Sequence, residues 1–203
     1  TGFPLFYRTD ARNISTALYG QADFNLTDRL RVTAGLRQTW DNRRAKQNFD
    51  DGFAPFNDTG NIDFNALTYT FGADWQAADK VFLYAAHRKG YRSGGFASAA
   101  ENDVQFTPFR PENVKDFEIG MKTQWRVGTV RGRFNLALFY SDYKDVQRTI
   151  PVSSATAVAF ATRNAASASI RGGEIEYVVQ PTDTLELSGY YALSRARYSS
   201  FKT

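Results

Sequence analysis

The chain has 203 residues, a net charge of +4, a single histidine and no cysteine. Its basic residues are scattered rather than gathered into runs, so nothing in the composition calls for a nucleic-acid partner. With only His87 and no thiol, the ordinary zinc sites are excluded as well. No stretch approaches the ~18 apolar residues of a membrane helix. A mean hydropathy of −0.46 excludes a helical membrane protein but not a membrane barrel, whose strands carry apolar residues at every second position.

Apolar and polar residues alternate with period two in successive segments, which predicts strands with one apolar and one polar face. In chain order these segments are Ile14 to Leu26, Leu30 to Arg37, Leu67 to Gln76, Val81 to Gly90, Asp116 to Trp125, Arg133 to Ser141, Ile170 to Gln180 and Leu185 to Leu193. The alternation is soft in the first. In the fourth segment, odd-numbered and even-numbered residues both include apolar side chains, so the alternation does not decide which set faces lipid. We therefore predict an all-β chain of about eight antiparallel strands.

The strands and their connections predict a bacterial outer-membrane barrel. About ten residues at ~3.3 Å each and a tilt of ~40° cross roughly 25 Å, the height of the apolar band of such a barrel. Short turns alternate with long polar loops, which would be periplasmic and extracellular respectively. The short turns are Leu26 to Arg29, Ala77 to Lys80, Arg126 to Thr129 and Pro181 to Thr184, and the long loops are Asn42 to Asp63, Ser93 to Asn113 and Pro151 to Ser167.

Two further groups of residues fit this topology. Trp75 and Trp125 each precede a short turn on the apolar face, as in an aromatic girdle at the periplasmic interface. The charged residues of the polar parity would face inward, where they meet water and pair across strands instead of meeting lipid. They are Asp23, Arg31, Arg37, Asp74, Glu118, Lys122, Arg133, Glu176 and Glu186.

This topology places both ends of the chain at the extracellular rim. Open sheet edges in lipid leave unpaired backbone groups, each costing several kcal/mol. We therefore expect flanking strands, with residues 1–203 forming part of one larger barrel domain. Two alternatives remain: a self-contained small outer-membrane barrel acting as an adhesin, porin-like protein or enzyme, and a soluble β-sandwich binding module.

Five stretches, in order, resemble the barrel of TonB-dependent receptors. They are Gly20 to Asn42, Val81 to Phe96 (VFLYAAHRKGYRSGGF), Phe109 to Trp125 (FRPENVKDFEIGMKTQW), Phe134 to Gln147 and Arg163 to Tyr191. The resemblance implies a barrel of about 22 strands with a plugged lumen. It also implies a Gram-negative outer-membrane transport receptor, not an enzyme, with no resident cofactor. Its partners would be lipid, its own plug domain, TonB and a cargo.

The cargo that the resemblance favours is a ferric siderophore, while vitamin B12, haem, other metal complexes and oligosaccharides stay open. Neither the plug nor its TonB-binding motif is found in this sequence, so no residue here is assigned to energy coupling. Candidate ligand residues lie at the outer rim, where arginine suits anionic chelates and aromatic rings stack on ring-bearing ligands. They are Tyr91, Arg92, Phe96, Arg110, Arg148 and Arg163. The alternative interpretation is that these side chains pack or anchor the outer loops.

Overall fold

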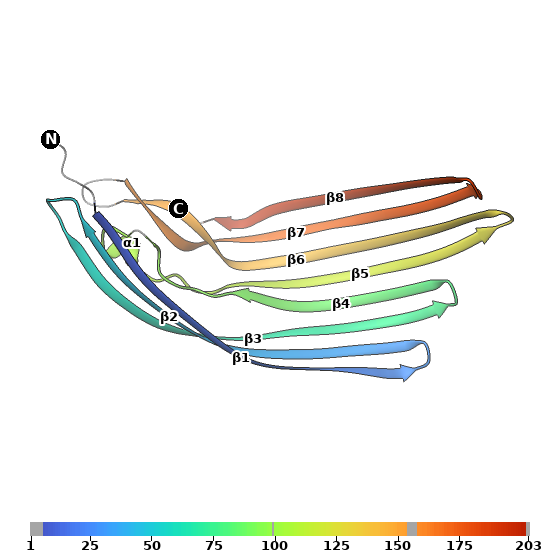
Figure 1. Cartoon of the computed structure of the whole chain (residues 1–203), viewed down its shortest axis with the longest axis horizontal. Coiled ribbons are helices and arrows are strands. Elements are labelled where there is room, and N and C mark those ends of the chain that lie inside the picture. The colour runs from blue at the N-terminus through green and yellow to red at the C-terminus, as the bar shows by residue number, and fades with distance from the viewer. Residues whose placement is uncertain (1–5, 99, 154–157, 202–203) are drawn as a thin grey trace.

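The computed structural model describes residues 6–98, 100–153 and 158–201, which form one antiparallel sheet in a single curved layer (Figure 1). The strands follow one another in space as they do in sequence, from β1 at one edge to β8 at the other. They are β1 (Phe6–Thr27), β2 (Leu30–Asp50), β3 (Phe56–Ala78), β4 (Val81–Arg92), β5 (Glu112–Val127), β6 (Val130–Ser153), β7 (Val158–Thr182) and β8 (Leu185–Phe201), with one short helix, α1 (Asp103–Phe106), between β4 and β5. The predicted up-and-down topology of eight strands is confirmed.

This arrangement differs from both alternatives left open by the sequence. A β-sandwich needs a second sheet packed on the first, whereas the described residues form one sheet. A closed eight-stranded barrel needs its first and last strands to pair, whereas β1 and β8 stand at opposite edges. The eight strands are therefore a segment of barrel wall. Within the described residues, no helix is long and apolar enough to cross a membrane.

The register places the predicted polar residues together on one face of the sheet. Arg31 of β2 lies opposite Asp74 of β3, with 2.5 Å between guanidinium nitrogen and carboxylate oxygen. Arg133 of β6 lies opposite Val178 and forms an ion pair of 3.2 Å with Glu176 of β7. These cross-strand pairs hold opposite charges side by side, as expected of a face that meets water.

The opposite face is apolar and has no protein layer to pack against. Leu67 and Trp75 on this face keep 50% and 49% of their surface exposed. Trp125 lies over Gly132 of the neighbouring strand, where an added Cβ would come within 2.2 Å of the indole ring. Exposed apolar side chains on one continuous face are a large liability in water, and lipid is the solvent that removes it.

The facing of β4, open from the sequence, is decided by its partners. The Tyr84 hydroxyl donates to Glu118 (2.9 Å), and Arg88 pairs with Asp116 and Glu118 at 2.6 and 2.7 Å. Even-numbered residues of β4 therefore lie on the polar face. His87 lies on the apolar face between Phe71 and Phe117, where its Nε2 is 2.9 Å from the Tyr69 hydroxyl.

Two of the predicted long loops are wrong in their bounds. Residues 42–63 and 151–167 belong mostly to β2, β3, β6 and β7, and β2 and β3 stay paired as far as Phe49 opposite Phe56. Beyond the apolar band both faces of a strand meet water, so alternation vanishes while the backbone hydrogen bonds continue. The short turns are confirmed, and Phe6 and Phe201 both lie at the end opposite to them (Figure 1).

Replacing Leu136 with Lys tests which face meets lipid. Leu136 lies opposite Met121 and Ile175 on the apolar face, about halfway along the band. We expect Leu136→Lys to lower the free energy of unfolding of the complete protein by ~2–4 kcal/mol, measured by guanidinium titration in lipid vesicles. The control is Asn135→Lys, one residue away on the polar face, where the ammonium meets Glu176, the present partner of Asn135. Equal losses in the two variants would contradict the assignment of the faces.

Candidate functional site

The segment between β4 and β5 turns back onto the polar face of the sheet. It begins with Gly94 and Gly95, and a pair of backbone hydrogen bonds joins Gly95 to Phe109 (3.1 and 2.9 Å). A Cβ on Gly94 would lie 2.2 Å from the Phe109 carbonyl oxygen, so only glycine permits this approach. Asn102 caps α1 by accepting from the Gln105 backbone N–H at 3.0 Å. We call residues 93–111 the inner loop.

Aromatic packing fixes the inner loop to the outer ends of β2 and β3. Phe96 stacks on Phe106 with ring centroids 5.0 Å apart, and Phe106 meets Phe56 edge-on at 6.1 Å. Ala45 of β2 and Ala100 of the inner loop complete this cluster, in which Phe106 is 3% exposed. Buried rings of this kind supply most of the apolar area that holds a loop in place.

Hydrogen bonds tie the inner loop to strands on both of its sides. The Tyr7 hydroxyl of β1 donates to the Glu101 carboxylate. Across the sheet, the Arg163 guanidinium of β7 donates to the backbone oxygens of Thr107 (3.3 Å) and Val104. The inner loop therefore bridges β1 and β7 over the strands between them.

A buried polar network lies where the inner loop leaves β4. The Asp41 carboxylate, 1% exposed, accepts from the Tyr91 hydroxyl and pairs with Arg43 at 3.2 Å. Arg43 in turn donates to the Ser93 hydroxyl oxygen at 3.1 Å. Burial alone would raise the pKa of Asp41, but donation from Tyr91 and other hydroxyls, with the charge of Arg43, holds it below its usual value.

A groove of about 350 Å³ opens beside this network at the outer end of the polar face. Its walls combine guanidinium groups, aromatic rings and amides, the groups that bind anionic and ring-bearing ligands. The lining residues are Ala11, Asn13, Arg43, Arg44, Ala45, Arg92, Ser93, Gly94, Gly95, Phe96, Phe109 and Gln147. Gln147 fixes both ends of the inner loop beside the groove by donating to the backbone oxygens of Ser93 and Arg110, both at 3.0 Å.

Three of the six predicted ligand residues meet at this groove. Arg92 and Phe96 line it, and Tyr91 lies behind it against Asp41. Arg92 is exposed, whereas Phe96 is partly buried by packing against the aromatic cluster. Of the six predicted ligand residues, Arg92 is therefore the one that presents an exposed guanidinium group to the groove.

The other three predicted residues lie apart from the groove and have partners of their own. Arg110 pairs with Asp145 at 3.0 Å, and Arg148 donates to the Tyr198 hydroxyl at 3.1 Å. Arg163 is the anchor of the inner loop. These contacts match the loop-anchoring interpretation, although they leave ligand contact by the same side chains untested.

Sequence reasoning missed Asp41, Arg43 and Gln147. Asp41 lies between the predicted strand and the loop predicted from Asn42, and Arg43 lies inside that loop, although both continue the alternate-residue spacing of Arg31 and Arg37. Gln147 follows an irregularity after Tyr143, where Asp145 takes a positive φ of 55°. A bulge of this kind breaks the alternation, so parity counted from Phe134 does not carry through to Gln147.

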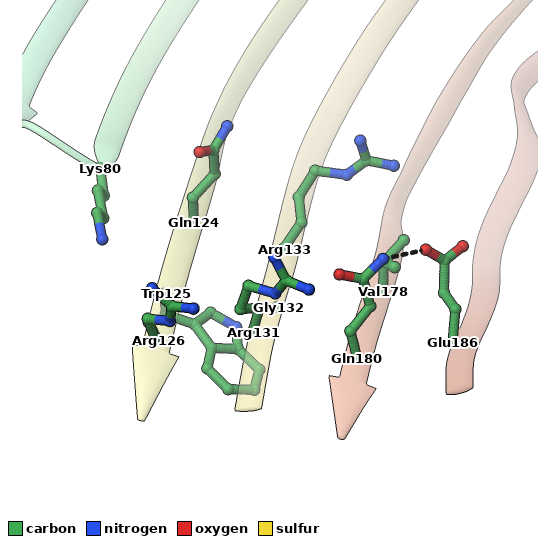
Figure 2. Close-up of a pocket in the computed structure, with 10 residues that line it drawn as sticks. All are labelled: Lys80, Gln124, Trp125, Arg126, Arg131, Gly132, Arg133, Val178, Gln180 and Glu186. Atoms are coloured by element: carbon green, nitrogen blue, oxygen red, sulfur yellow. Dashed lines mark hydrogen bonds between the residues drawn. The ribbon is translucent and has the colours of Figure 1, made fainter. Parts of the chain in front are cut away.

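A second hollow, of about 480 Å³, lies at the opposite end of the sheet beside the short turns. Figure 2 shows guanidinium and amide side chains of β5, β6 and β7 gathering there, with Gln180 donating to Glu186 of β8 at 2.5 Å. Arg131 is paired with Asp183 (3.0 Å) and Arg133 with Glu176, so much of the positive charge in this hollow is already compensated. The outer groove is the better candidate site. Within the described residues, no group of three or more metal-ligating side chains gathers.

Comparison with known proteins agrees with the fold. The family model described as TonB dependent receptor-like, beta-barrel, matches residues 1–203. The pesticin receptor of Yersinia enterocolitica is 25% identical over 161 residues, which are 79% of this chain and 23% of that protein. The ferric yersiniabactin uptake receptor FyuA of Yersinia pestis superposes with a TM-score of 0.80 at 20% identity, covering 96% of this chain and 28% of that structure.

The FrpB iron transporter of Neisseria meningitidis superposes with a TM-score of 0.67, also at 20% identity, over 98% of this chain and 28% of that structure. The chain thus spans about a quarter of the length of each of these proteins.

Removing the Arg163 guanidinium should release the inner loop. Arg163→Ala deletes the hydrogen bonds to Thr107 and Val104, so local opening should become roughly five- to thirtyfold more frequent for a loss of 1–2 kcal/mol. Limited thermolysin digestion of residues 93–111 measures this. Arg148→Ala, on the directly opposed residue of β6, is the control and should leave the cleavage rate unchanged. Equal cleavage of the two variants would contradict the anchor.

The anchor to β1 should weaken at high pH. Donation to Glu101 raises the pKa of Tyr7 to about 12, because the carboxylate favours the neutral phenol. A raised pKa means that the contribution is complete below pH ~10 and is lost as pH rises towards 12. A difference titration of tyrosinate absorbance between the wild type and Tyr7→Phe should show this midpoint, and Glu101→Gln should move it back towards 10. A midpoint near 10 in the wild type would show that the bond is absent.

Proposed function

The chain belongs to the TonB-dependent receptor-like β-barrel family, and we propose that the receptor whose wall it forms imports a ferric siderophore across the outer membrane. The observation that carries this proposal is the outer groove, where arginine and aromatic side chains meet at the extracellular end of the inward face. Siderophore complexes are commonly anionic and often bear rings, so the two kinds of group match two features of the cargo.

The groove would capture cargo that arrives from outside. Arg92 is exposed at its mouth, and Phe96 and Phe109 form its apolar wall. Arg43 contributes less free charge, because Asp41 at 3.2 Å already compensates it. Five lining residues belong to the inner loop, so a displacement of this loop changes the shape of the groove; they are Ser93, Gly94, Gly95, Phe96 and Phe109. Binding and loop position are therefore coupled in this proposal.

The rest of the cycle would involve parts outside this sequence. The inward ion pairs, such as Arg31 with Asp74 and Arg88 with Asp116, form a hydrated surface against which a plug domain would sit. TonB would act on that plug, and the energised inner membrane would drive release of the cargo. The wall supplies a fixed, charged frame and the outer half of the binding site.

Arg92 is the residue whose loss should weaken binding most directly. The complete receptor carrying Arg92→Gln should bind a ferric siderophore about tenfold more weakly, the cost of one charge-assisted hydrogen bond. Ferric yersiniabactin is the first probe, because FyuA is similar in fold, and binding is measured by quenching of tryptophan fluorescence. Lys46→Gln, an exposed cation on the opposite face, is the control.

Two results would overturn the proposal. If no ferric siderophore in a panel of catecholate, hydroxamate and mixed types binds the receptor, the cargo class is wrong. If binding is equal in Arg92→Gln and wild type, the groove is not the binding site. Uptake of a bound probe should stop in cells that lack TonB while surface binding remains.

A further inference from the structure

A third cavity, of about 340 Å³, lies towards the extracellular end of β6, β7 and β8. Ser141 of β6 donates to the Asp116 carboxylate of the inward face at 3.1 Å. Ile170 of β7 is opposite Ser141, and Ala196 of β8 is opposite Ile170. Since directly opposed residues face the same side, Ile170 and Ala196, which both line the cavity, face inward. We call this cavity the β7 hollow.

Two tyrosine rings flank a small residue in the β7 hollow. Tyr143 of β6 is opposite Ala168 of β7, which is opposite Tyr198 of β8, so the three form the next inward row. Neighbouring strands lie ~4.8 Å apart, which separates the two tyrosine Cβ atoms by ~10 Å with one methyl group between them. An aromatic ring placed over Ala168 would have a tyrosine on each side, at distances suited to ring contacts.

The β7 hollow is apolar on a face that is otherwise polar. Val146, which is 2% exposed, lines it together with Ile170 and the two alanines. Inward positions nearby carry charge instead, as in the ion pair of Arg88 with Asp116. Inward side chains meet water, so solvation does not explain an apolar recess at this place. A recess of this kind is suited to removing an apolar part of a ligand from water.

One guanidinium group stands at the edge of the β7 hollow with hydrogen-bonding capacity to spare. Arg148 donates from Nε to the Tyr198 hydroxyl oxygen at 3.1 Å and from Nη1 to the backbone oxygen of Gln147 at 3.0 Å. Within the residues that the structure describes, its Nη2 donates to no group and Arg148 joins no ion pair. Glu112, which also lines the hollow, accepts from the Gln147 backbone N–H at 2.9 Å. An oxyanion at Nη2 would therefore meet an unpaired guanidinium.

The β7 hollow lies next to the outer groove. Gln147 lines the groove, whereas its chain neighbours Val146 and Arg148 line the hollow. Phe109 of the inner loop lines the groove, and Glu112, just after that loop, lines the hollow. A ligand made of two parts can therefore occupy both cavities. A volume of about 340 Å³ is at the lower end for ligand pockets, so the hollow suits one ring rather than a whole chelate.

We infer that the β7 hollow binds an aromatic ring that carries one anionic oxygen, with the ring over Ala168 between the two tyrosines and the oxygen on Arg148. The Glu112 carboxylate would repel a second negative charge, which favours a singly charged ring. Such a ring has two sources. As part of a ferric chelate it would be a portion of the cargo, and the inference then rests on the proposed function. As a free aryl acid it would bind independently of that function.

The probe is 2-hydroxybenzoate, and the protein is the complete receptor purified in detergent. Titration followed by ligand-observed NMR should give a Kd of about 1 mM, which is ordinary for a ligand of so few atoms. Cyclohexanecarboxylate has the charge without the aromatic ring, and benzyl alcohol has the ring without the charge. Each should bind at least tenfold more weakly than 2-hydroxybenzoate.

Two substitutions remove the two halves of the site separately. Arg148→Gln should weaken binding of 2-hydroxybenzoate about tenfold, and Arg148→Lys, which keeps the charge, should recover part of that loss. Ala168→Leu should abolish binding, because the larger side chain fills the gap between the tyrosines. Arg195→Gln, on the outward face opposite Arg171, is the matched control and should bind as the wild type does. Absence of binding to the wild type, or unchanged binding in either Arg148→Gln or Ala168→Leu, would overturn the inference.

Ferric chelates distinguish the two sources of the ring. If the ring belongs to the cargo, Ala168→Leu should weaken binding of a ferric chelate with phenolate rings at least tenfold and leave a ferric trihydroxamate, which has no such ring, unchanged. If the ring is a free acid, Ala168→Leu should lose 2-hydroxybenzoate and bind both chelates as the wild type does. A receptor that binds no ferric siderophore contradicts the proposed function, while the 2-hydroxybenzoate titration still decides this inference.

Discussion

The structure depends on a backbone hydrogen-bond ladder that must be complete inside a solvent without hydrogen-bonding partners. Each strand of this sheet pairs with its neighbours in sequence, over nearly the whole length of β1 and β2 and over the half nearer the short turn for β3 with β4. Because the ladder satisfies the backbone, the sheet can remain one layer thick and still be stable in lipid. A single layer has two faces and no interior, so every side chain must suit one solvent or the other.

This constraint explains how charge is distributed on the wall. Inside, opposite charges alternate across strands, as with Arg88 between Asp116 and Glu118, and the face is neutral over short distances. Outside, charge is absent from the band and returns at its extracellular margin, as at Lys89, Lys115 and Asp142. Water screens charges anywhere on the inner face, whereas the outer face meets water only beyond the apolar band. The two faces therefore carry different charge patterns for different surroundings.

The inner loop converts part of this wall into a site. Gly94 allows the chain to turn against Phe109, and the aromatic cluster then fixes Phe96 beside the groove. Anchors at Tyr7 and Arg163 lie on strands that are far apart in the sheet. A ligand that displaces the loop must break contacts with both. The loop is therefore placed to report occupancy of the groove to strands on either side.

The sequence by itself determined the strands, their order and the faces of all of them except β4. Alternation in segments such as Leu67 to Gln76 is dictated by the two solvents, so it can be read without coordinates. It also placed Arg92 and Phe96 at the outer rim. The sequence pattern did not predict the outer halves of β2 and β3 as strands. Both faces of these segments meet water, so alternation is absent and only backbone pairing maintains the strands.

Only the tertiary structure decided the facing of β4, the partners of Asp41 and the opposition of Arg171 to Arg195. In each case the deciding contact joins residues from different segments. Register between strands sets those contacts, and a shift of one residue would exchange the two faces. Local pattern records which solvent a residue prefers, whereas the site arises from the residues that the register brings together.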